Sequence, residues 1–205
     1  MFSKEYTCPA CGAPIEQKRI GSRMLVCSYC AQTSFINADS LDAVGEKAPL
    51  LDYGSSFAIG KMGTYQDKEF MVLGRLRYEY EDGFWDEWYL NCFDGSTLWV
   101  QEDDGSFVVF YYEEELSYRL DYARTRVGST VEITAEINNV FVTAKSKAHI
   151  QGGEGELPFR VIPGNQADFI DGIMQGKIVS AEFLPDENVV YVGEAVELED
   201  LKLRA

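Results

Sequence analysis

Residues 70–93 read FMVLGRLRYEYEDGFWDEWYLNCF, and this stretch decides the fold class. From Phe70 to Tyr80 apolar and polar side chains alternate, which is typical of a half-buried strand. The turn Glu81-Asp82-Gly83 leads into a second apolar run, Trp85 to Phe93. Asp-Gly between such runs is a strong hairpin signal. Further strands are predicted at residues 97–101 and 107–112, each preceded by another Asp-Gly turn. This half of the chain is therefore predicted to be an antiparallel meander.

The second half of the chain is predicted to repeat this organisation. Gly54 to Ile59 resembles Gly128 to Ile133 at an offset of 74 residues, so each segment is predicted to open one of two related units. Two such units bury their apolar faces against each other as a sandwich or a barrel. One short helical turn is expected at Ala167 to Met174.

The N-terminal segment carries two C-x-x-C pairs, Cys8 with Cys11 and Cys27 with Cys30, separated by a spacer of 15 residues. This spacing is typical of a zinc site. Each C-x-x-C turn directs two thiolates at one point about 2.3 Å from a metal, and two turns complete a tetrahedron. The sequence therefore predicts a zinc ribbon with these four cysteines as ligands.

Four thiolates leave no open coordination position, so the predicted Zn²⁺ is structural. An iron centre is the alternative metal, because four thiolates also suit iron. A redox role for either pair is disfavoured, because no βαβ pattern lies beside it. The spacer from Ile15 to Val26 is predicted to form a hairpin with its tip at Gly21-Ser22. So short a segment buries little core, so metal binding is expected to supply its folding free energy.

The predicted fold class is mainly β, with the zinc ribbon followed by two tandem, related antiparallel β units. The predicted domains are the ribbon at residues 1–38, a polar linker at 39–50, a first β unit at 51–125 and a second at 126–205.

The charge balance restricts the expected partners. The chain contains 34 Asp and Glu residues against 18 Lys and Arg, a formal net charge of -16. Such a surface repels nucleic acid and anionic lipid headgroups and favours basic protein segments or small cations. The same charge also serves simply to keep a protein soluble. A nucleic-acid partner is therefore not expected.

The distribution of apolar and cysteine residues indicates the cellular location expected for the protein. No apolar run approaches the roughly 20 residues of a membrane helix, and the N-terminus lacks the apolar core of a secretory signal. Five cysteines favour metal binding in a reducing compartment over disulfides. The protein is expected to be cytoplasmic, with no integral membrane segment.

Aromatic and acidic side chains are dense along the meander and suggest a ligand site. Aromatic faces and carboxylates together suit a cation such as a polyamine. The alternative is ordinary packing, with the tryptophans in the core and the acids on the wet face. The candidate ligand-binding residues are Trp85, Glu87, Trp88, Trp99 and Glu102.

No catalytic residue is predicted, and the chain is not expected to be an enzyme. His149 is the single histidine and has no nucleophile signature beside it. Cys92 is expected to be a buried small apolar residue. The sequence lacks a phosphate-binding glycine loop, an H-E-x-x-H pair and a dinucleotide fingerprint.

A set of residues spread over the β region matches a known pattern: Ile59-Gly60, Leu73-Gly74-Arg75, Trp85, Glu87-Trp88, Leu90, Gly95, Trp99, Gly155-Glu156-Leu157-Pro158, Pro163-Gly164, Glu182 and Gly193. On these residues the β region resembles a bacterial family of domains of unknown function that often follows a zinc ribbon. The resemblance implies a duplicated β fold, genes near those of phage-shock and other membrane-stress proteins and of polyamine enzymes, and no established activity.

Two functions are therefore expected from the sequence. The first is a non-enzymatic zinc-ribbon adaptor that binds a protein partner in a membrane-stress-linked system. The second is a binder of a small cationic ligand through the aromatic and acidic residues above.

Overall fold

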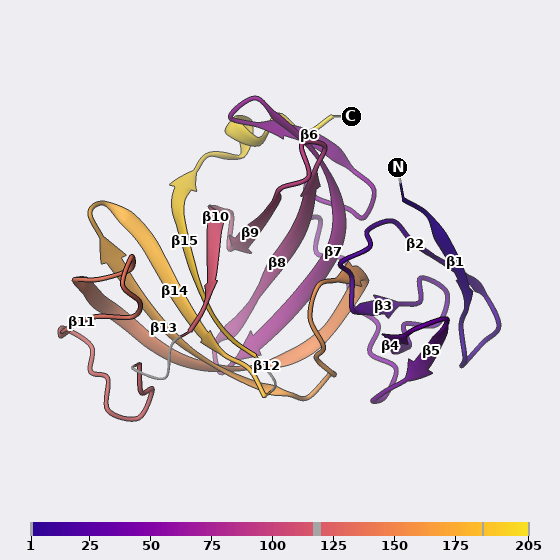
Figure 1. Cartoon of the computed structure of the whole chain (residues 1–205), viewed down its shortest axis with the longest axis horizontal. Coiled ribbons are helices and arrows are strands. Elements are labelled where there is room, and N and C mark those ends of the chain that lie inside the picture. The colour runs from indigo at the N-terminus through magenta and orange to yellow at the C-terminus, as the bar shows by residue number, and fades with distance from the viewer. Residues whose placement is uncertain (1, 117–119, 186, 205) are drawn as a thin grey trace.

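The computed structural model describes residues 2–116, 120–185 and 187–204, and these residues form an almost entirely β fold (Figure 1). Eight antiparallel strands close into a barrel, and the N-terminal ribbon lies beside it. The predicted fold class is confirmed, with a barrel as the architecture. The barrel strands are β7 (Lys68–Tyr80), β8 (Gly83–Cys92), β9 (Thr97–Asp103), β10 (Ser106–Glu115), β12 (Val140–Leu157), β13 (Gln166–Met174), β14 (Lys177–Phe183) and β15 (Asn188–Val196).

The sequence alternation places side chains inside or outside the barrel, with one shift. Leu76 and Tyr78 pack into the interior cluster, whereas Phe70 and Val72 pack into a cluster outside the barrel. A bulge between Val72 and Gly74 causes this change of face, because one extra residue reverses the alternation. The single continuous apolar face expected for this strand is therefore divided between two cores.

The two β units are related in structure, but in a different alignment from the one expected. The Gly60 amide donates to the Val72 carbonyl oxygen, and the Gly128 amide donates in the same way to Val142. Each valine precedes a bulge in its strand. Gly60, and not Gly54, is thus the structural equivalent of Gly128. The first unit contributes β7–β10 and β6 (Met62–Tyr65), and the second contributes β12–β15 and β11 (Thr130–Val131).

The expected helical turn at Ala167 to Met174 is wrong. These residues belong to β13, which pairs with both β12 and β14. Ala167 and Phe169 face the interior and Ile170 faces the outer core, so the segment follows the two-residue period of a strand. A 3₁₀ helix, η1 (Leu198–Leu201), follows the last strand and covers the outer cluster through Leu201.

Strand β12 closes the barrel and holds the ribbon. Along its 18 residues it pairs first with β13, then with β7 and finally with the ribbon. Where it pairs with β7, Gly155 lies opposite Gly74. We call this pairing of β7 with β12 the seam. A Cβ atom on Gly74 would lie far inside van der Waals contact of the Glu156 carbonyl oxygen, and a Cβ atom on Gly155 would lie as deep inside contact of the Leu73 carbonyl oxygen. The two backbones can approach this closely only because neither residue has a side chain.

In place of the expected central hairpin, the ribbon contains one two-stranded sheet and a three-stranded extension of the barrel sheet. The two strands within the cysteine spacer do not pair with each other: β2 pairs with β1, and β3 pairs with β4 and β12. The hairpin prediction for Ile15 to Val26 is therefore wrong. Part of the predicted linker, Ser40–Ala43, forms β5 against β4. The other ribbon strands are β1 (Lys4–Thr7), β2 (Pro14–Gln17), β3 (Met24–Val26) and β4 (Thr33–Asn37).

Among the described residues, none of the helical segments has the length and apolar character required to cross a bilayer.

Candidate functional site

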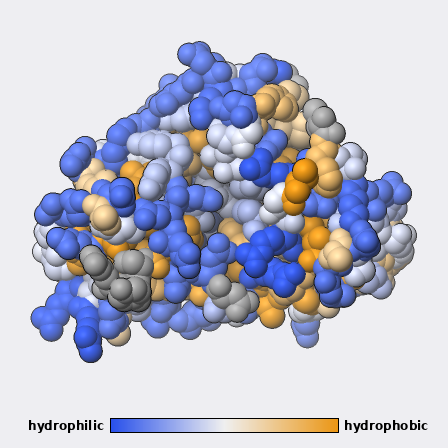
Figure 2. Space-filling view, in the orientation of Figure 1, coloured by the Kyte–Doolittle hydropathy of each residue, from blue (hydrophilic) through white to orange (hydrophobic). Residues whose placement is uncertain are grey.

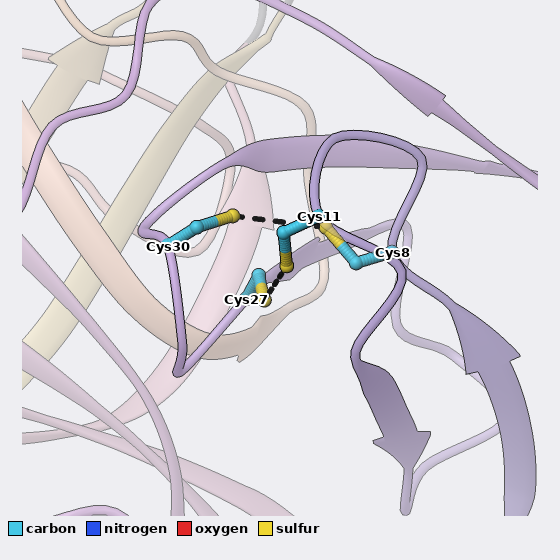
Figure 3. Close-up of side chains that lie close together, drawn as sticks. All are labelled: Cys8, Cys11, Cys27 and Cys30. Carbon is cyan, nitrogen blue, oxygen red and sulfur yellow. Dashed lines mark hydrogen bonds between the residues drawn. The ribbon is translucent and has the colours of Figure 1, made fainter.

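The two C-x-x-C pairs meet at one point of the ribbon (Figure 3). The sulfurs of Cys8 and Cys30 lie 3.8 Å apart and those of Cys11 and Cys27 lie 3.7 Å apart, and all four lie within 4.8 Å of one another. A tetrahedron with metal–sulfur bonds of about 2.3 Å has edges of about 3.8 Å. The spacing therefore fits a single tetrahedral ion, and these four cysteines could bind a metal.

Tight backbone turns position the four sulfurs. The Gly12 amide donates to the Cys8 carbonyl oxygen at 2.9 Å, and the Ala31 amide donates to that of Cys27 at 2.8 Å. Both Gly12 and Ala31 have positive φ, which lets the chain reverse directly after each pair. Burial opposes ionisation of Cys8, but the amides of Ala10 and Cys11 and the neighbouring thiols lower its pKa to about 7. The thiolate is the form that binds a metal.

A buried carboxylate joins the ribbon to the barrel. The Glu156 side chain, 3% exposed, accepts hydrogen bonds from the amides of Lys18 and Arg19 at 2.9 and 3.1 Å. Its third bond, at 2.7 Å, comes from the Ser22 hydroxyl. Burial raises the pKa of Glu156, and these donors counter the shift. Because β3 also pairs with β12 at this residue, the ribbon and the barrel form one continuous structure.

A cleft of about 890 Å³ lies between the cysteine site and the barrel. Cys27, Cys30 and Tyr29 line it from the ribbon, and Arg75 and Trp88 line it from the barrel. Figure 2 shows a face that is mostly hydrophilic, with hydrophobic side chains emerging between the hydrophilic ones, including beside the ribbon. We call the cleft between the cysteine site and the barrel the junction cleft.

Buried ion pairs fix the barrel wall of the junction cleft. The Asp86 carboxylate accepts from Arg75 at 2.7 Å and from Arg77 at 2.8 and 2.7 Å. The Arg75 guanidinium lies 4.7 Å from the centre of the Trp88 ring. All these groups lie on the outer face of β7 and β8, so they give the cleft a rigid polar wall.

The five predicted ligand-binding residues divide between the two faces of the barrel wall. Trp85 and Trp99 pack in the interior, where the Trp85 indole donates to the Glu87 carboxylate at 2.9 Å. Trp88 lies in the outer cluster and donates to Glu102 at 2.8 Å. Of the five, Trp88 alone lines the junction cleft. The structure therefore brings together Trp85 and Glu87, and separately Trp88 and Glu102, whereas Trp99 stacks on Phe159 elsewhere in the interior.

Two interior acids accompany Glu87. Asp171 on β13 accepts from the Ser180 hydroxyl at 2.8 Å, and Glu182 on β14 is 3% exposed. Both face the barrel interior from the opposite wall to Glu87, as the register of β13, β14 and β15 requires. Sequence reasoning missed this cluster, because β8 comes to face β13 and β14 only when the barrel closes. The available signal was an acid at an inward-facing position of an otherwise apolar strand.

Burial and mutual repulsion keep protons on the interior acids. Burial raises the pKa of Glu87 to about 7, with the charge of Asp171 acting in the same direction and the Trp85 and Tyr78 side chains opposing it. Burial, followed by the charges of Glu87 and Asp171, raises the pKa of Glu182 well above its usual value. Carboxyls so placed share protons at neutral pH.

Comparison with known families assigns the barrel. The sequence profile described as "Domain of unknown function (DUF4178)" matches residues 58–198. The chain belongs to this family. The DUF4178 match contains all eight barrel strands, whereas the four-cysteine ribbon lies outside it. No curated protein and no solved structure matches the chain.

The cysteine geometry predicts one metal ion per chain. Cys11→Ser removes one ligand, so we expect this variant to lose the ion and the order of the ribbon. Cys92→Ser is the matched control, because Cys92 is buried in the outer cluster of the barrel and should keep the ion despite a loss of stability. Elemental analysis and native mass spectrometry measure both. Equal metal content in wild type and Cys11→Ser would contradict the assignment.

The raised pKa of Glu87 predicts a pH-dependent stability. Between about pH 4.5 and pH 7 the folded protein retains a proton on Glu87 that the unfolded chain has lost. The contribution of Glu87 to the free energy of unfolding therefore falls as pH rises through that window. Glu87→Gln removes the effect. We expect the variant to gain up to about 3 kcal/mol over wild type at pH 8 and clearly less at pH 5. Chemical unfolding at both pH values measures this, with the exposed Glu79→Gln as control. A gain independent of pH would be the contrary result.

Proposed function

We propose that this DUF4178 protein is a non-enzymatic zinc-ribbon adaptor that binds a protein partner at the junction cleft. The observation that carries the proposal is the continuity of the ribbon and the barrel across β3, β12 and Glu156. Ribbon and barrel residues line one cleft together. A partner bound there would contact both parts at fixed geometry, which lowers the entropic cost of binding.

The proposed metal is Zn²⁺ in a structural role. Four sulfur ligands at tetrahedral spacing favour zinc or iron, and they leave no position for a reacting water. In this role the ion holds the two cysteine turns together and thereby shapes the ribbon wall of the junction cleft. The thiolate set requires a reducing environment, which supports the expected cytoplasmic location.

The chemistry of the cleft rim indicates a partner segment with apolar and basic side chains. Tyr29 is 74% exposed and Ile59 is 40% exposed, and both line the cleft. Carboxylates of Glu16 and Asp52 lie in the same lining, and the whole chain carries a net charge of -16. Exposed apolar side chains beside acids match a segment that carries Lys or Arg next to an aliphatic or aromatic residue. The resemblance to a membrane-stress-linked family supplies the proposed cellular setting.

Paired substitutions test the cleft as the docking surface. Tyr29→Ser with Ile59→Ser removes its exposed apolar rim, and we expect partner recovery to fall at least tenfold. Val127→Ser with Phe141→Ser is the matched control, since both residues are exposed and outside the cleft lining. Quantitative cross-linking and affinity purification of the full chain, with the same lysate for each variant, measures the recovery. The proposal fails if both double variants recover the same proteins in the same amounts.

A further inference from the structure

Among the described residues, Glu87, Asp171 and Glu182 face the barrel interior without an ion pair to balance their charge. Glu87, Asp171 and Glu182 come from three different strands and face the same space. Among the described residues, no lysine or arginine forms an ion pair with any of the three. An uncompensated buried carboxylate is costly. The core would be more stable with apolar residues at these positions, so the acids need another explanation.

Unpartnered polar atoms lie in the same space. The Tyr78 side chain is 0% exposed, and its hydroxyl lies beside the Glu87 carboxyl without forming a hydrogen bond of normal geometry to any described residue. Burial raises its pKa first, and the charges of Glu87 and Glu182 raise it further, so the three groups lie close together. One oxygen of Glu182, Oε2, is also buried without a hydrogen-bond partner. Buried polar groups are nearly always satisfied, so these atoms indicate a missing partner.

A second group of acids lines a hollow outside this cluster. A hollow of about 540 Å³ at one end of the barrel is lined by Glu113, Glu115 and Glu187, with Arg23 as its cation. Burial raises the pKa of Tyr191, and the charges of Glu182, Glu113, Glu87 and Glu187 raise it further. Tyr191 therefore lies near both the acids of the hollow and those of the interior. Both groups of acids attract a positive charge to this end of the barrel.

The geometry favours an organic cation over a metal ion. In the part of the chain that the structure describes, the four cysteines are the one group of potential ligands gathered within 4.8 Å, so the interior carboxylates do not form a compact coordination shell. Aromatic rings surround them instead. Tyr78 and Trp85 stack with their centres 5.0 Å apart, and Phe169 packs edge-on against both. Aromatic faces and separated carboxylates suit an ammonium group with an aliphatic body.

We propose that the barrel interior binds a small organic cation with a primary ammonium group, held between Glu87 and Glu182 with the Tyr78 hydroxyl as a third polar contact. This site is separate from the junction cleft and does not depend on the adaptor function. It retains two of the residues expected from sequence, Trp85 and Glu87, and adds Tyr78, Asp171 and Glu182.

Isothermal titration of the full-length protein at pH 8 tests the proposal. The probes are n-butylammonium chloride, 1,4-diaminobutane dihydrochloride and magnesium chloride. We expect saturable binding of at least one of the two amines and no saturable binding of magnesium. Binding of magnesium alone, or of none of the three, overturns the proposal. In the latter case the interior acids are simply protonated.

Substitutions locate the site within the barrel. Glu182→Gln and Tyr78→Phe are expected to weaken amine binding at least tenfold, about the loss of one charge-assisted hydrogen bond. Tyr78→Phe should leave the unliganded protein at least as stable as wild type, because it removes a buried unpartnered oxygen. Glu182→Gln keeps a buried polar group but cannot ionise, so it too should be at least as stable as wild type at pH 8. The exposed Glu79→Gln should bind like wild type. Equal affinity in Glu182→Gln, Tyr78→Phe and wild type overturns the assignment even if an amine binds.

Discussion

The close approach of two backbones at Gly74 and Gly155 is the constraint on which the rest of the structure depends. Here β7 and β12 complete the barrel, and neither position tolerates a Cβ without moving a carbonyl group across the seam. Closure brings the walls of the two units together, which places Glu87 opposite Asp171 and Glu182. The acidic interior is therefore a consequence of closure, and so is the position of β12 at the ribbon.

The same strand makes the ribbon part of the barrel. Directly after the seam, β12 pairs with β3, and Glu156 accepts bonds from the chain just before β3. Metal binding and barrel closure are thus linked through one segment, Gly155 to Leu157. The junction cleft lies where these two elements meet, and residues of both line it. This linkage explains how a small metal-stabilised element gains a defined orientation without a large core of its own.

Much of the fold could be predicted from sequence because local sequence patterns determine it. The alternation from Phe70 onward and the Asp-Gly turns predicted β7–β10, and the two C-x-x-C pairs predicted the cysteine cluster. Long-range features could not be predicted in this way. The bulge after Val72 reverses the facing of side chains, and the true repeat aligns Gly60 with Gly128. The separation of Trp85 from Trp88 follows from the two-residue period of β8 and was readable from the sequence. The meeting of Glu87 with Glu182 was not, because it depends on pairing between distant strands.

Equilibrium unfolding of Gly74→Ala, compared with Gly21→Ala, tests the role of the seam most directly. Gly21 has a normal φ and its nearest neighbour would lie 3.8 Å from an added Cβ, so its substitution introduces no crowding. If the contact between Gly74 and Gly155 closes the barrel, Gly74→Ala should lose roughly 3 kcal/mol of stability and Gly21→Ala should lose almost none. Equal stability of the two variants would contradict the claim that this backbone contact closes the barrel.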